Sequence, residues 1–188
     1  PGGPVSGFDC GPGNCLLDAW IREKRRKLYD ARGAWAASGR VIPRLLTKLL
    51  AHPFIRRQPP KSTGRDEFNL QWVKRLLSGN ESAADVQATL LELTAVTIAS
   101  AVRRYCAGAR EVFVCGGGAR NRALLARLAR LLPGKRVSTT AALGIEPGHV
   151  EALAFAWLAR EALKYRPANL PAVTGARGPR VLGAIYPR

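Results

Sequence analysis

Two glycine-rich turns are the residues in this sequence best suited to hold a charged ligand. Gly11-Pro12-Gly13-Asn14 and Gly116-Gly117-Gly118 each stand between a predicted strand and a predicted helix. Glycine lets the backbone approach a ligand closely, and the free N–H groups at the start of the following helix attract a phosphate. Neither turn matches a Walker or a GxGxxG motif, and a plain capping turn also accounts for either one alone. The pair together favours a phosphate-bearing ligand.

Carboxylates and a polar loop stand close to these turns in the sequence. Asp9 ends the predicted strand 5–10, from which a side chain in an α/β sheet can reach a ligand; an Asx-turn role is the equal alternative. Glu151 lies in the first turn of the predicted helix 150–164, where complementing the helix dipole is the favoured role. The loop Lys61-Ser62-Thr63-Gly64-Arg65 offers cations and hydroxyls for an anion or a sugar.

The spacing of apolar residues predicts the elements that must position these groups. The first half of the chain should form a strand at 5–10, a helix at 16–28 and an irregular stretch at 29–69 with short helical pieces such as 44–50. A helix of about 22 residues should then begin at the capping box Ser82–Asp85. The second half should form a strand at 111–115, a helix carrying Leu124 and Leu128, a strand at 135–139 and a helix at 150–164. Strands that alternate with helices predict an α/β domain with a largely parallel sheet.

Two of these helices have a clear predicted inner face. Val86, Leu90, Leu93 and Thr97 follow one face of the long helix, and Leu153, Trp157 and Leu158 should point inward from the last one. The stretch 86–102 is the most apolar in the chain, but Gln87 and Glu92 interrupt it, which favours a core helix over a membrane span.

Length and composition predict one domain able to build a core. The chain has 188 residues, of which 47% are hydrophobic. Its 30 Lys and Arg against 13 Asp and Glu give a net charge of +17, which favours phosphate-bearing partners: nucleic acid, nucleotide or anionic lipid. The basic residues are dispersed and no nucleic-acid-binding signature occurs, so solvated faces are favoured over a nucleic-acid groove.

Metal and targeting signals are weak. Four cysteines form no CxxC pair and there are two histidines, His52 and His149, so we expect reduced thiols and no zinc site. Each histidine stands beside a predicted helix start, where a surface or capping role is favoured over a catalytic one. The chain begins with Pro1 and has no Met, which favours a fragment, and no signal peptide is visible.

Several blocks of the sequence resemble a known family. In order they are Phe8-Asp-Cys-Gly-Pro-Gly-Asn14 with Asp18-Ala-Trp20, Tyr29-Asp30 with Gly33-Ala-Trp35-Ala36, Pro59-Pro-Lys-Ser-Thr-Gly-Arg65, Val114-Cys-Gly-Gly-Gly-Ala-Arg-Asn121, Thr139-Thr140, Val150-Glu-Ala-Leu-Ala-Phe-Ala-Trp157 and Asn169-Leu-Pro-Ala-Val-Thr-Gly-Ala176. Their order and spacing resemble anhydro-N-acetylmuramic acid kinases over nearly the entire chain.

The resemblance implies a fold and a reaction. The fold would be a ribonuclease H-like, actin-like ATPase lobe, with a mixed, largely parallel sheet flanked by helices. Residues 1–188 would form the single C-terminal lobe of a two-lobe kinase, with 29–69 as an irregular insertion and the first phosphate loop in a lobe before residue 1. With ATP and Mg²⁺, the kinase would open 1,6-anhydro-N-acetylmuramic acid and phosphorylate O6 in peptidoglycan recycling. Half a cleft cannot enclose ATP, so we expect the isolated chain to be inactive.

The resemblance also assigns roles to individual residues. Asp9 would be the general base that deprotonates the attacking water. The other implied roles are ATP binding by Gly11, Gly13, Gly116, Gly117, Gly118 and Asn121, and sugar binding by Asn14, Glu151, Lys61 and Arg65, where Lys61 and Arg65 serve as substrate contacts or as structural braces. No residue is assigned to a metal, and the family implies a cytoplasmic homodimer without nucleic-acid or membrane partners.

Two positions depart from the family pattern. The family usually has Thr where this chain has Cys10, and a thiol is a weaker hydrogen-bond donor to phosphate. It tends to have Asp where this chain has Ala141. These departures keep open a non-catalytic remnant of the kinase. A sugar or acetate kinase with another acceptor, and a basic nucleic-acid-binding module, are the remaining alternatives.

Overall fold

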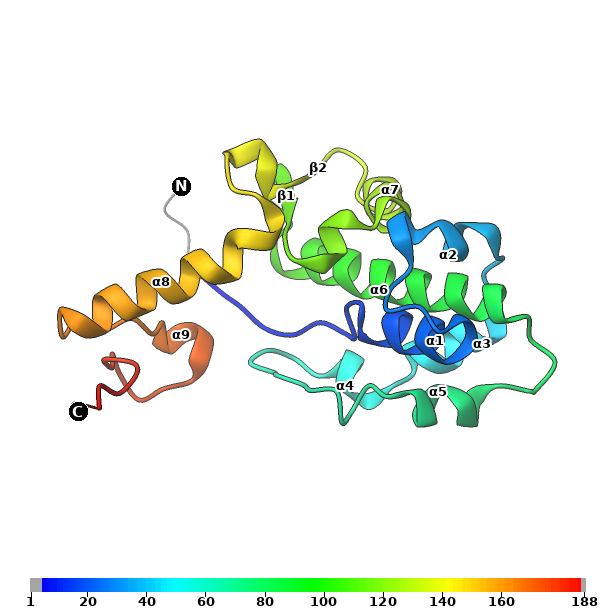
Figure 1. The fold of residues 1–188 in the computed structure, drawn as a ribbon, viewed down its shortest axis with the longest axis horizontal. Helices are drawn as coiled ribbons and strands as arrows, with labels where there is room; N and C mark the ends of the chain where they lie inside the picture. The colour runs from blue at the N-terminus through cyan, green and yellow to red at the C-terminus, as the bar shows by residue number, and fades with distance from the viewer. Residues whose placement is uncertain (1–4, 187–188) are drawn as a thin grey trace.

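One long helix, α6 (Ala83–Tyr105), runs through the middle of the computed structural model, which describes residues 5–186 (Figure 1). Its capping box is confirmed, since the Ser82 hydroxyl accepts a hydrogen bond from the Asp85 N–H at 3.1 Å. The predicted inner face is confirmed as well: Val86, Leu90, Leu93 and Thr97 are at most 4% exposed. In the described part of the chain, α6 alone is long and apolar enough to cross a membrane, but 67% of its most apolar window is buried in the fold. It is a core helix.

Shorter helices surround α6 and bury its sides. They are α1 (Cys15–Arg25), α2 (Ala34–Ser38), α3 (Pro43–Leu50), α4 (Pro53–Arg56), α5 (Leu70–Leu76) and α7 (Arg122–Leu131). Helices α1, α2, α3 and α7 pack directly on α6. The stretch 29–69, expected as an irregular insertion, consists of the 3₁₀ turn η1 (Ala31–Gly33), α2, α3 and α4 with their connections, and it supplies Trp35, Leu49 and Phe54 to the same hydrophobic core.

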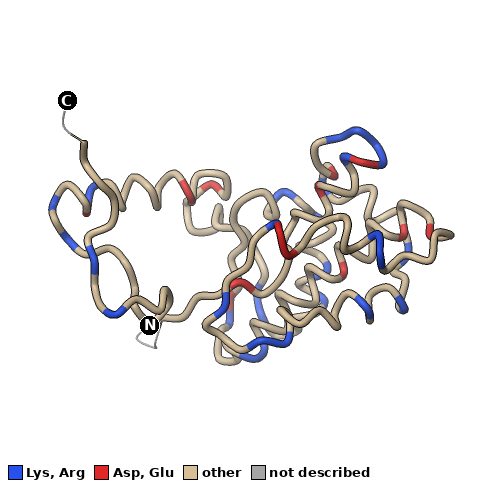
Figure 2. Tube along the Cα trace, turned by 90° about the horizontal axis from the view of Figure 1, so that it is seen from below, with Lys and Arg blue, Asp and Glu red and all other residues tan. Residues whose placement is uncertain are grey.

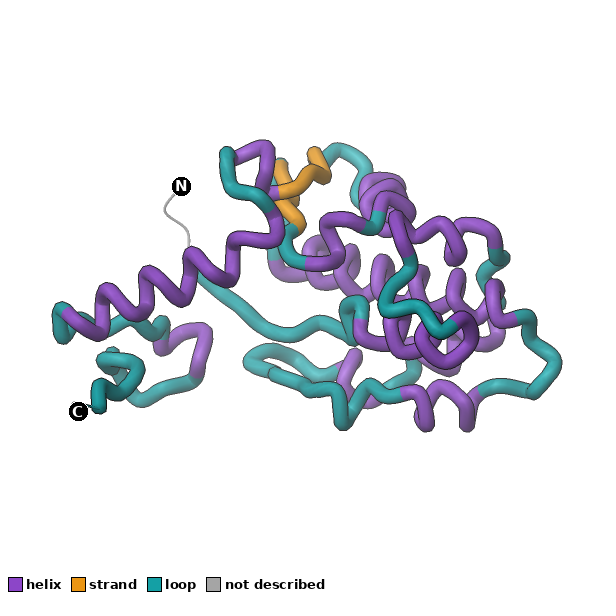
Figure 3. Tube along the Cα trace, viewed as in Figure 1, coloured by secondary structure: helices purple, strands orange, loops and turns teal. Residues whose placement is uncertain are grey.

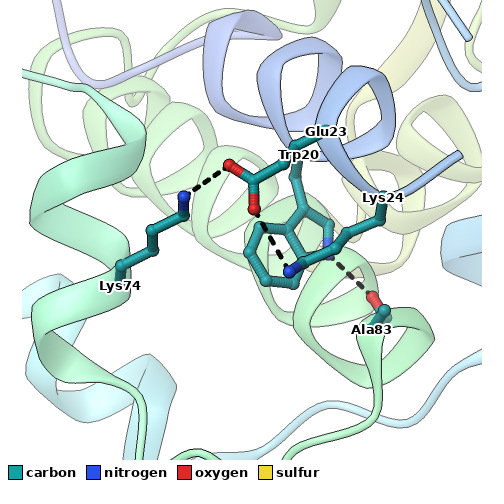
Figure 4. A network of polar contacts seen from close by, with 5 residues as sticks. All are labelled: Trp20, Glu23, Lys24, Lys74 and Ala83. Carbon is teal, nitrogen blue, oxygen red and sulfur yellow. Dashed lines mark hydrogen bonds and ion pairs between the residues drawn. The ribbon is translucent and has the colours of Figure 1, made fainter. Parts of the chain in front are cut away.

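Helix α1 is tied to two neighbours at once (Figure 4). The indole N–H of Trp20 donates to the Ala83 carbonyl at 2.8 Å, where α6 begins. On the exposed side, the Glu23 carboxylate pairs with Lys74 of α5 at 2.6 Å and with Lys24 at 3.1 Å. These ion pairs lower the pKa of Glu23, chiefly through the hydrogen bond from Lys74. Exposed pairs add at most about 1 kcal/mol, so the buried indole anchors the helix.

The sheet in the described residues is a parallel pair, β1 (Glu111–Val114) and β2 (Arg136–Thr139), in register from Glu111 opposite Arg136 to Val114 opposite Thr139 (Figure 3). Helix α7 connects the two strands, as the alternation of apolar segments predicts. The α/β class is therefore correct. The larger ribonuclease H-like sheet implied by the resemblance stays a prediction.

Two predictions near the start of the chain are wrong. Residues 5–10 form no strand in the structure; within the described chain this segment makes one backbone bond, from the Asp9 N–H to the Lys61 carbonyl at 3.1 Å. A strand needs a hydrogen-bonded ladder, and one bond does not make a ladder. Helix α1 ends at Arg25 rather than at residue 28, because Arg26 adopts a left-handed conformation with φ of +57°, and Leu28 is 68% exposed.

The last long helix has the predicted bounds but not the predicted inner face. Helix α8 (Val150–Leu163) follows the 3₁₀ turns η3 (Thr140–Leu143) and η4 (Pro147–His149), and the short α9 (Pro171–Thr174) comes after it. Leu153 is 52% and Trp157 45% exposed, so both were wrongly expected to face inward. The element that α8 contacts most is η4, and the helix extends away from α6 (Figure 1). Apolar spacing identifies a helix but does not say what covers it.

The central position of α6 leads to a stability prediction. Leu93→Ala on α6 removes a fully buried side chain, so we expect the free energy of unfolding to fall by roughly 2–5 kcal/mol. The matched control Leu153→Ala on α8 should change it by about 0.5 kcal/mol or less. Urea unfolding followed by circular dichroism measures both. Equal losses would contradict the assignment of α6 as the core.

Candidate functional site

The first glycine turn is seated on α6. The Thr94 hydroxyl donates to the Gly13 carbonyl at 2.7 Å. A Cβ added at Gly11 would lie 2.6 Å from the Thr97 Oγ1, so this residue has no room for a side chain. Gly13 has a φ of +56°, which glycine adopts without strain. The core helix therefore fixes where the predicted phosphate turn lies.

The second glycine turn leads into α7 through a 3₁₀ segment, η2 (Gly117–Arg120). Gly116, with a φ of +68°, donates its N–H to the Pro147 carbonyl at 2.9 Å. Asn121 follows as the N-cap of α7, its Oδ1 accepting from the Leu124 N–H at 3.0 Å. The helix that sequence spacing placed directly after the glycines thus starts five residues beyond Gly117, at Arg122.

The two turns lie side by side. A Cβ added at either Gly117 or Gly118 would lie 3.7 Å from the Asn14 Nδ2. Asn14 stands at the N-cap of α1, but its side chain makes no capping hydrogen bond there and lies against the second turn instead. The structure therefore brings Asn14, which was predicted to bind the sugar, against the second turn, which was predicted to bind ATP, although Asn14 and Gly117 are 103 positions apart. Their binding role stays a prediction.

Asp9 is joined to the loop that follows residue 60. The Ser62 hydroxyl donates to Asp9 Oδ2 at 2.9 Å and the Thr63 N–H donates to the same oxygen at 2.8 Å. The exposed carboxylate opens into a shallow hollow of about 600 Å³. Val173 and Thr174 of α9 also line this hollow. The carboxylate thus bonds to a loop 53 residues away, not within its own turn as an Asx-turn role requires.

Lys61 braces the same loop. Its ammonium donates to the carbonyls of Phe54 at 3.1 Å and Ile55 at 3.3 Å, and lies 4.7 Å from the centre of the Phe54 ring. Burial lowers the pKa of Lys61, and the nearby charges of Arg104 and Arg57 act in the same direction. Of the two roles left open for Lys61, these contacts favour the structural brace.

The remaining predicted sugar-binding residues lie apart from Asp9. Arg65 lines a separate hollow with Asp18 and Arg22. Glu151 is exposed in the first turn of α8 and does not line the hollow beside Asp9. The structure therefore brings Lys61 to Asp9 but not Arg65 or Glu151.

The two departures from the family pattern lie in different surroundings. Cys10 lines a small cavity of about 100 Å³ that it shares with Lys61 and Thr97, and burial raises the pKa of its thiol. Asp9 does not line that cavity, so the neighbouring residues 9 and 10 line two different cavities. Ala141 is exposed in η3.

A further hollow of about 190 Å³ lies beside the paired turns. Three predicted residues line it, Asn14, Gly117 and Asn121. Asp18, Tyr29, Asp30 and Arg32 line it too, and the sequence analysis gave them no role. Burial raises the pKa of Asp18, and Arg22 and Arg65 oppose this effect. The sequence signal for these residues was the block Tyr29-Asp30 with Gly33, since an Asp and a Gly three positions apart are typical of a tight capped turn.

The distribution of basic residues and potential metal ligands over residues 5–186 bears on a second site. Lys and Arg occur over all parts of the trace in Figure 2, in line with dispersed solvated faces. Among residues 5–186 no group of three His, Cys, Asp or Glu side chains is placed to hold a metal ion. His52 caps α4, its Nδ1 accepting from the Phe54 N–H at 3.3 Å, as expected of a capping histidine.

The turn at Gly33 is fixed against the second glycine turn, and this can be tested. A Cβ at Gly33 would lie 2.1 Å from Asn121 Oδ1, at a φ of +72°. We expect Gly33→Ala to lower the free energy of unfolding by roughly 2–5 kcal/mol, because left-handed strain and overpacking add together. The control Gly79→Ala has a φ of +96° but no described atom within 4 Å, so it should cost about 1–2 kcal/mol. Thermal or urea unfolding distinguishes them, and equal losses would refute the contact.

Comparison with known proteins shows the family of this chain. The family model of anhydro-N-acetylmuramic acid kinase matches residues 1–188. A protein of that name from Pseudomonas syringae pv. tomato is 59% identical over 186 residues, covering 98% of this chain and 51% of the relative. Those of the same name from Nitrosomonas europaea and Thiobacillus denitrificans are each 55% identical, over 98% and 100% of this chain and 51% of each relative. The chain spans about half the length of these curated relatives, and it belongs to the anhydro-N-acetylmuramic acid kinase family.

Proposed function

We propose that this chain is one half of an ATP-dependent kinase that converts 1,6-anhydro-N-acetylmuramic acid to N-acetylmuramic acid 6-phosphate and opens the anhydro ring with water. The observation that carries the proposal is the family match over the whole chain. The paired glycine turns and the carboxylate of Asp9 beside an open hollow are the chemistry that such a reaction needs. In the cell the product would enter peptidoglycan recycling.

ATP would lie along the paired turns. Gly11 and Gly13 at the start of α1 offer backbone close to the phosphates, and the N-terminus of this helix favours negative charge. Gly116, Gly117, Gly118 and Asn121 would lie against the adenosine end. Because Asn14 touches the second turn, one nucleotide can reach both sets of residues.

Mg²⁺ would arrive with the nucleotide. Magnesium in kinases is held mostly by substrate phosphates and water, with one or two carboxylates. The described residues 5–186 offer no cluster of three metal-ligating side chains, and a nucleotide-borne ion does not need one. When bound, the ion neutralises charge on the β- and γ-phosphates. We assign no residue of this chain to it.

Asp9 would act as the general base. Within the described structure both hydrogen bonds to its carboxylate end on Oδ2, so Oδ1 is the oxygen that would accept the proton of water. The water oxygen bonds to the anomeric carbon while the bond from that carbon to O6 breaks. O6 keeps the electron pair and attacks the γ-phosphorus, and ADP leaves. Ser62 and Thr63 hold the carboxylate in place.

The remaining parts of the proposal follow the family. The sugar would occupy the hollow beside Asp9, with Lys61 as brace of its wall, whereas Asn14 lines the other hollow, beside the paired turns. Contacts from Glu151 and Arg65 to the sugar stay predictions, as do the cytoplasmic location, the homodimer and which lobe of the kinase the chain forms. The other half of the cleft would come from the part of the family's length that this chain does not span.

A chimeric enzyme tests the proposal. In it, this chain replaces the matching segment of the Pseudomonas syringae relative. We expect ATP-dependent conversion of 1,6-anhydro-N-acetylmuramic acid to the 6-phosphate. Asp9→Asn should lower kcat by roughly 10²- to 10⁴-fold, since the base is lost. Asp66→Asn, an exposed carboxylate of the neighbouring loop, should leave kcat unchanged.

Three results would overturn parts of this assignment. A folded chimera without turnover, beside an active parent relative, would make the chain a non-catalytic remnant. Phosphorylation of other sugars but not of the anhydro-sugar would change the acceptor. Full activity of the Asp9→Asn variant would remove Asp9 as the base.

A further inference from the structure

Helix α8 has a burial pattern opposite to that of an ordinary surface helix. Within the described helix the one buried residue is the charged Glu161, which is 6% exposed. The large apolar residues are open to solvent instead, with Leu153 at 52%, Phe155 at 71%, Trp157 at 45% and Leu163 at 68% exposure. We call these four side chains the α8 surface. Because large apolar side chains rarely gather in the open, the pattern indicates an interaction surface.

The α8 surface runs around the helix rather than along one side. Successive residues of a helix turn by about 100°, so Phe155 lies on the opposite side from Leu153 and Trp157. Of the fourteen residues of α8, the charged ones are Glu151, Arg160 and Glu161. A helix that is apolar all round belongs in the interior of a protein or in a membrane. The helix rises about 21 Å, short of the ~30 Å hydrocarbon core of a bilayer, so protein is the expected cover.

The contacts that cover α8 within residues 5–186 lie at its two ends. A Cβ added at Gly183 would lie 3.9 Å from the Ala162 Cβ, so the C-terminal segment touches the last turn. At the other end, the element that α8 contacts most is η4, directly before it in the chain. Residues 151–157 between these ends are all exposed, and the helix extends away from α6 (Figure 1). The described chain therefore leaves the middle of α8 uncovered.

The segment after α8 fixes the helix in place. The Asn169 amide donates to the Gly178 carbonyl at 3.1 Å, and the Asn169 Oδ1 accepts from the Arg180 N–H at 2.6 Å. These bonds close a loop that contains α9. A Cβ added at Gly7 would lie 2.9 Å from the Val173 Cγ1, so α9 rests against the first described residues of the chain. Because α8 is attached through η4 before it and α9 after it, a partner would meet a preformed surface.

The length of the family points to the occupant of this surface. Three relatives are about twice as long as the chain, which covers 51% of each. A further half of that size is large enough to lie against two sides of a helix. A second copy of this chain, related by a two-fold axis, would cover one side of α8 and leave either Phe155 or Trp157 exposed. The remaining half of the family's length therefore fits the all-round surface better than a second copy.

We propose that the α8 surface is where the remaining half of the family's length packs against this half. The inference rests on the proposed function in one respect, that the chain is one half of a longer kinase. It adds which element joins the two halves. Phe155 and its three apolar neighbours become part of a core that the halves share. Because Val173 and Thr174 of α9 line the hollow beside Asp9, this contact lies one element away from the proposed base.

Thermal unfolding in two settings tests the inference. In the isolated chain Phe155→Gln replaces an exposed side chain, so the Tm should stay within about 2 °C of the original. In the chimeric enzyme the same side chain is buried, so the Tm of the chimera should fall by roughly 3–10 °C. Leu153→Gln, on the opposite side of the helix, should show the same contrast. Equal effects of Phe155→Gln in the two settings would overturn the inference.

The matched control is an exposed apolar residue far from α8. Val41, which is 39% exposed, belongs to the connection between α2 and α3. These two helices lie at the opposite end of the molecule from α8 (Figure 1). Val41→Gln should therefore change the Tm of the isolated chain and that of the chimera by the same amount.

Oxidation of side chains by hydroxyl radicals locates the cover without any substitution. Trp157 should be oxidised readily in the isolated chain. In the chimera it should be oxidised as slowly as the buried Trp35, which is 5% exposed. A readily oxidised Trp157 in a folded chimera would refute the proposal. So would a dimer of the isolated chain, detected by sedimentation, in which Trp157 is already protected, since the occupant would then be a second copy.

Kinase activity separates this inference from the proposed function. An active chimera in which Trp157 stays exposed keeps the kinase and removes the α8 contact. A folded chimera without turnover in which Trp157 is protected keeps the α8 contact and removes the catalytic function.

Discussion

The contact between two buried threonines of α6 and the first glycine turn is the constraint on which the site depends. Thr94 holds the Gly13 carbonyl, and Thr97 fills the space that a side chain at residue 11 would need. Both threonines are at most 4% exposed, and a hydroxyl buried in a core must be hydrogen-bonded. The hydrogen bond from Thr94 to Gly13 thus gives a buried hydroxyl a partner and at the same time fixes the position of the turn. The Thr94 hydroxyl also lies 3.2 Å from the Leu90 carbonyl of its own helix, so the bond to Gly13 is the one that carries the position of the turn.

The second turn is tied to the same helix through α7. The Arg127 guanidinium forms two hydrogen bonds with the Glu92 carboxylate, each 2.6 Å long, and Glu92 is 7% exposed. This pairing raises the pKa of Arg127 and fixes α7 against α6. Asn121, at the start of α7, donates its N–H to the Gly118 carbonyl at 3.1 Å, and its side chain lies against Gly33. The two turns therefore belong to one rigid body, which suits a ligand that must touch both.

The sequence predicts well those elements that are marked by a local motif, such as a capping box or a regular spacing of leucines. Ser82 and Asp85 mark the start of α6, and the leucine spacing of α7 between two β-branched runs predicts the parallel pair. The segment before Asp9 was taken for a strand because its composition suits one, but strand formation depends on a partner elsewhere in the chain. The prediction that Leu153 and Trp157 face inward was wrong for a related reason, since periodicity does not reveal what covers a helix.

For the site, the glycines and Asp9 were visible as motifs. Lys61 as a brace and Tyr29 at a hollow depend on tertiary contacts that no local pattern encodes.

Helix α8 is less densely packed than α6, which lowers the free energy needed to open it locally. Its most extensive contact is with the short turn η4, whereas α6 is packed by four helices. Proteins unfold locally in cooperative units whose free energies follow the density of their contacts. We therefore expect the amide protons of α8 to exchange with solvent by local opening, and those of α6 to exchange only when the whole domain unfolds.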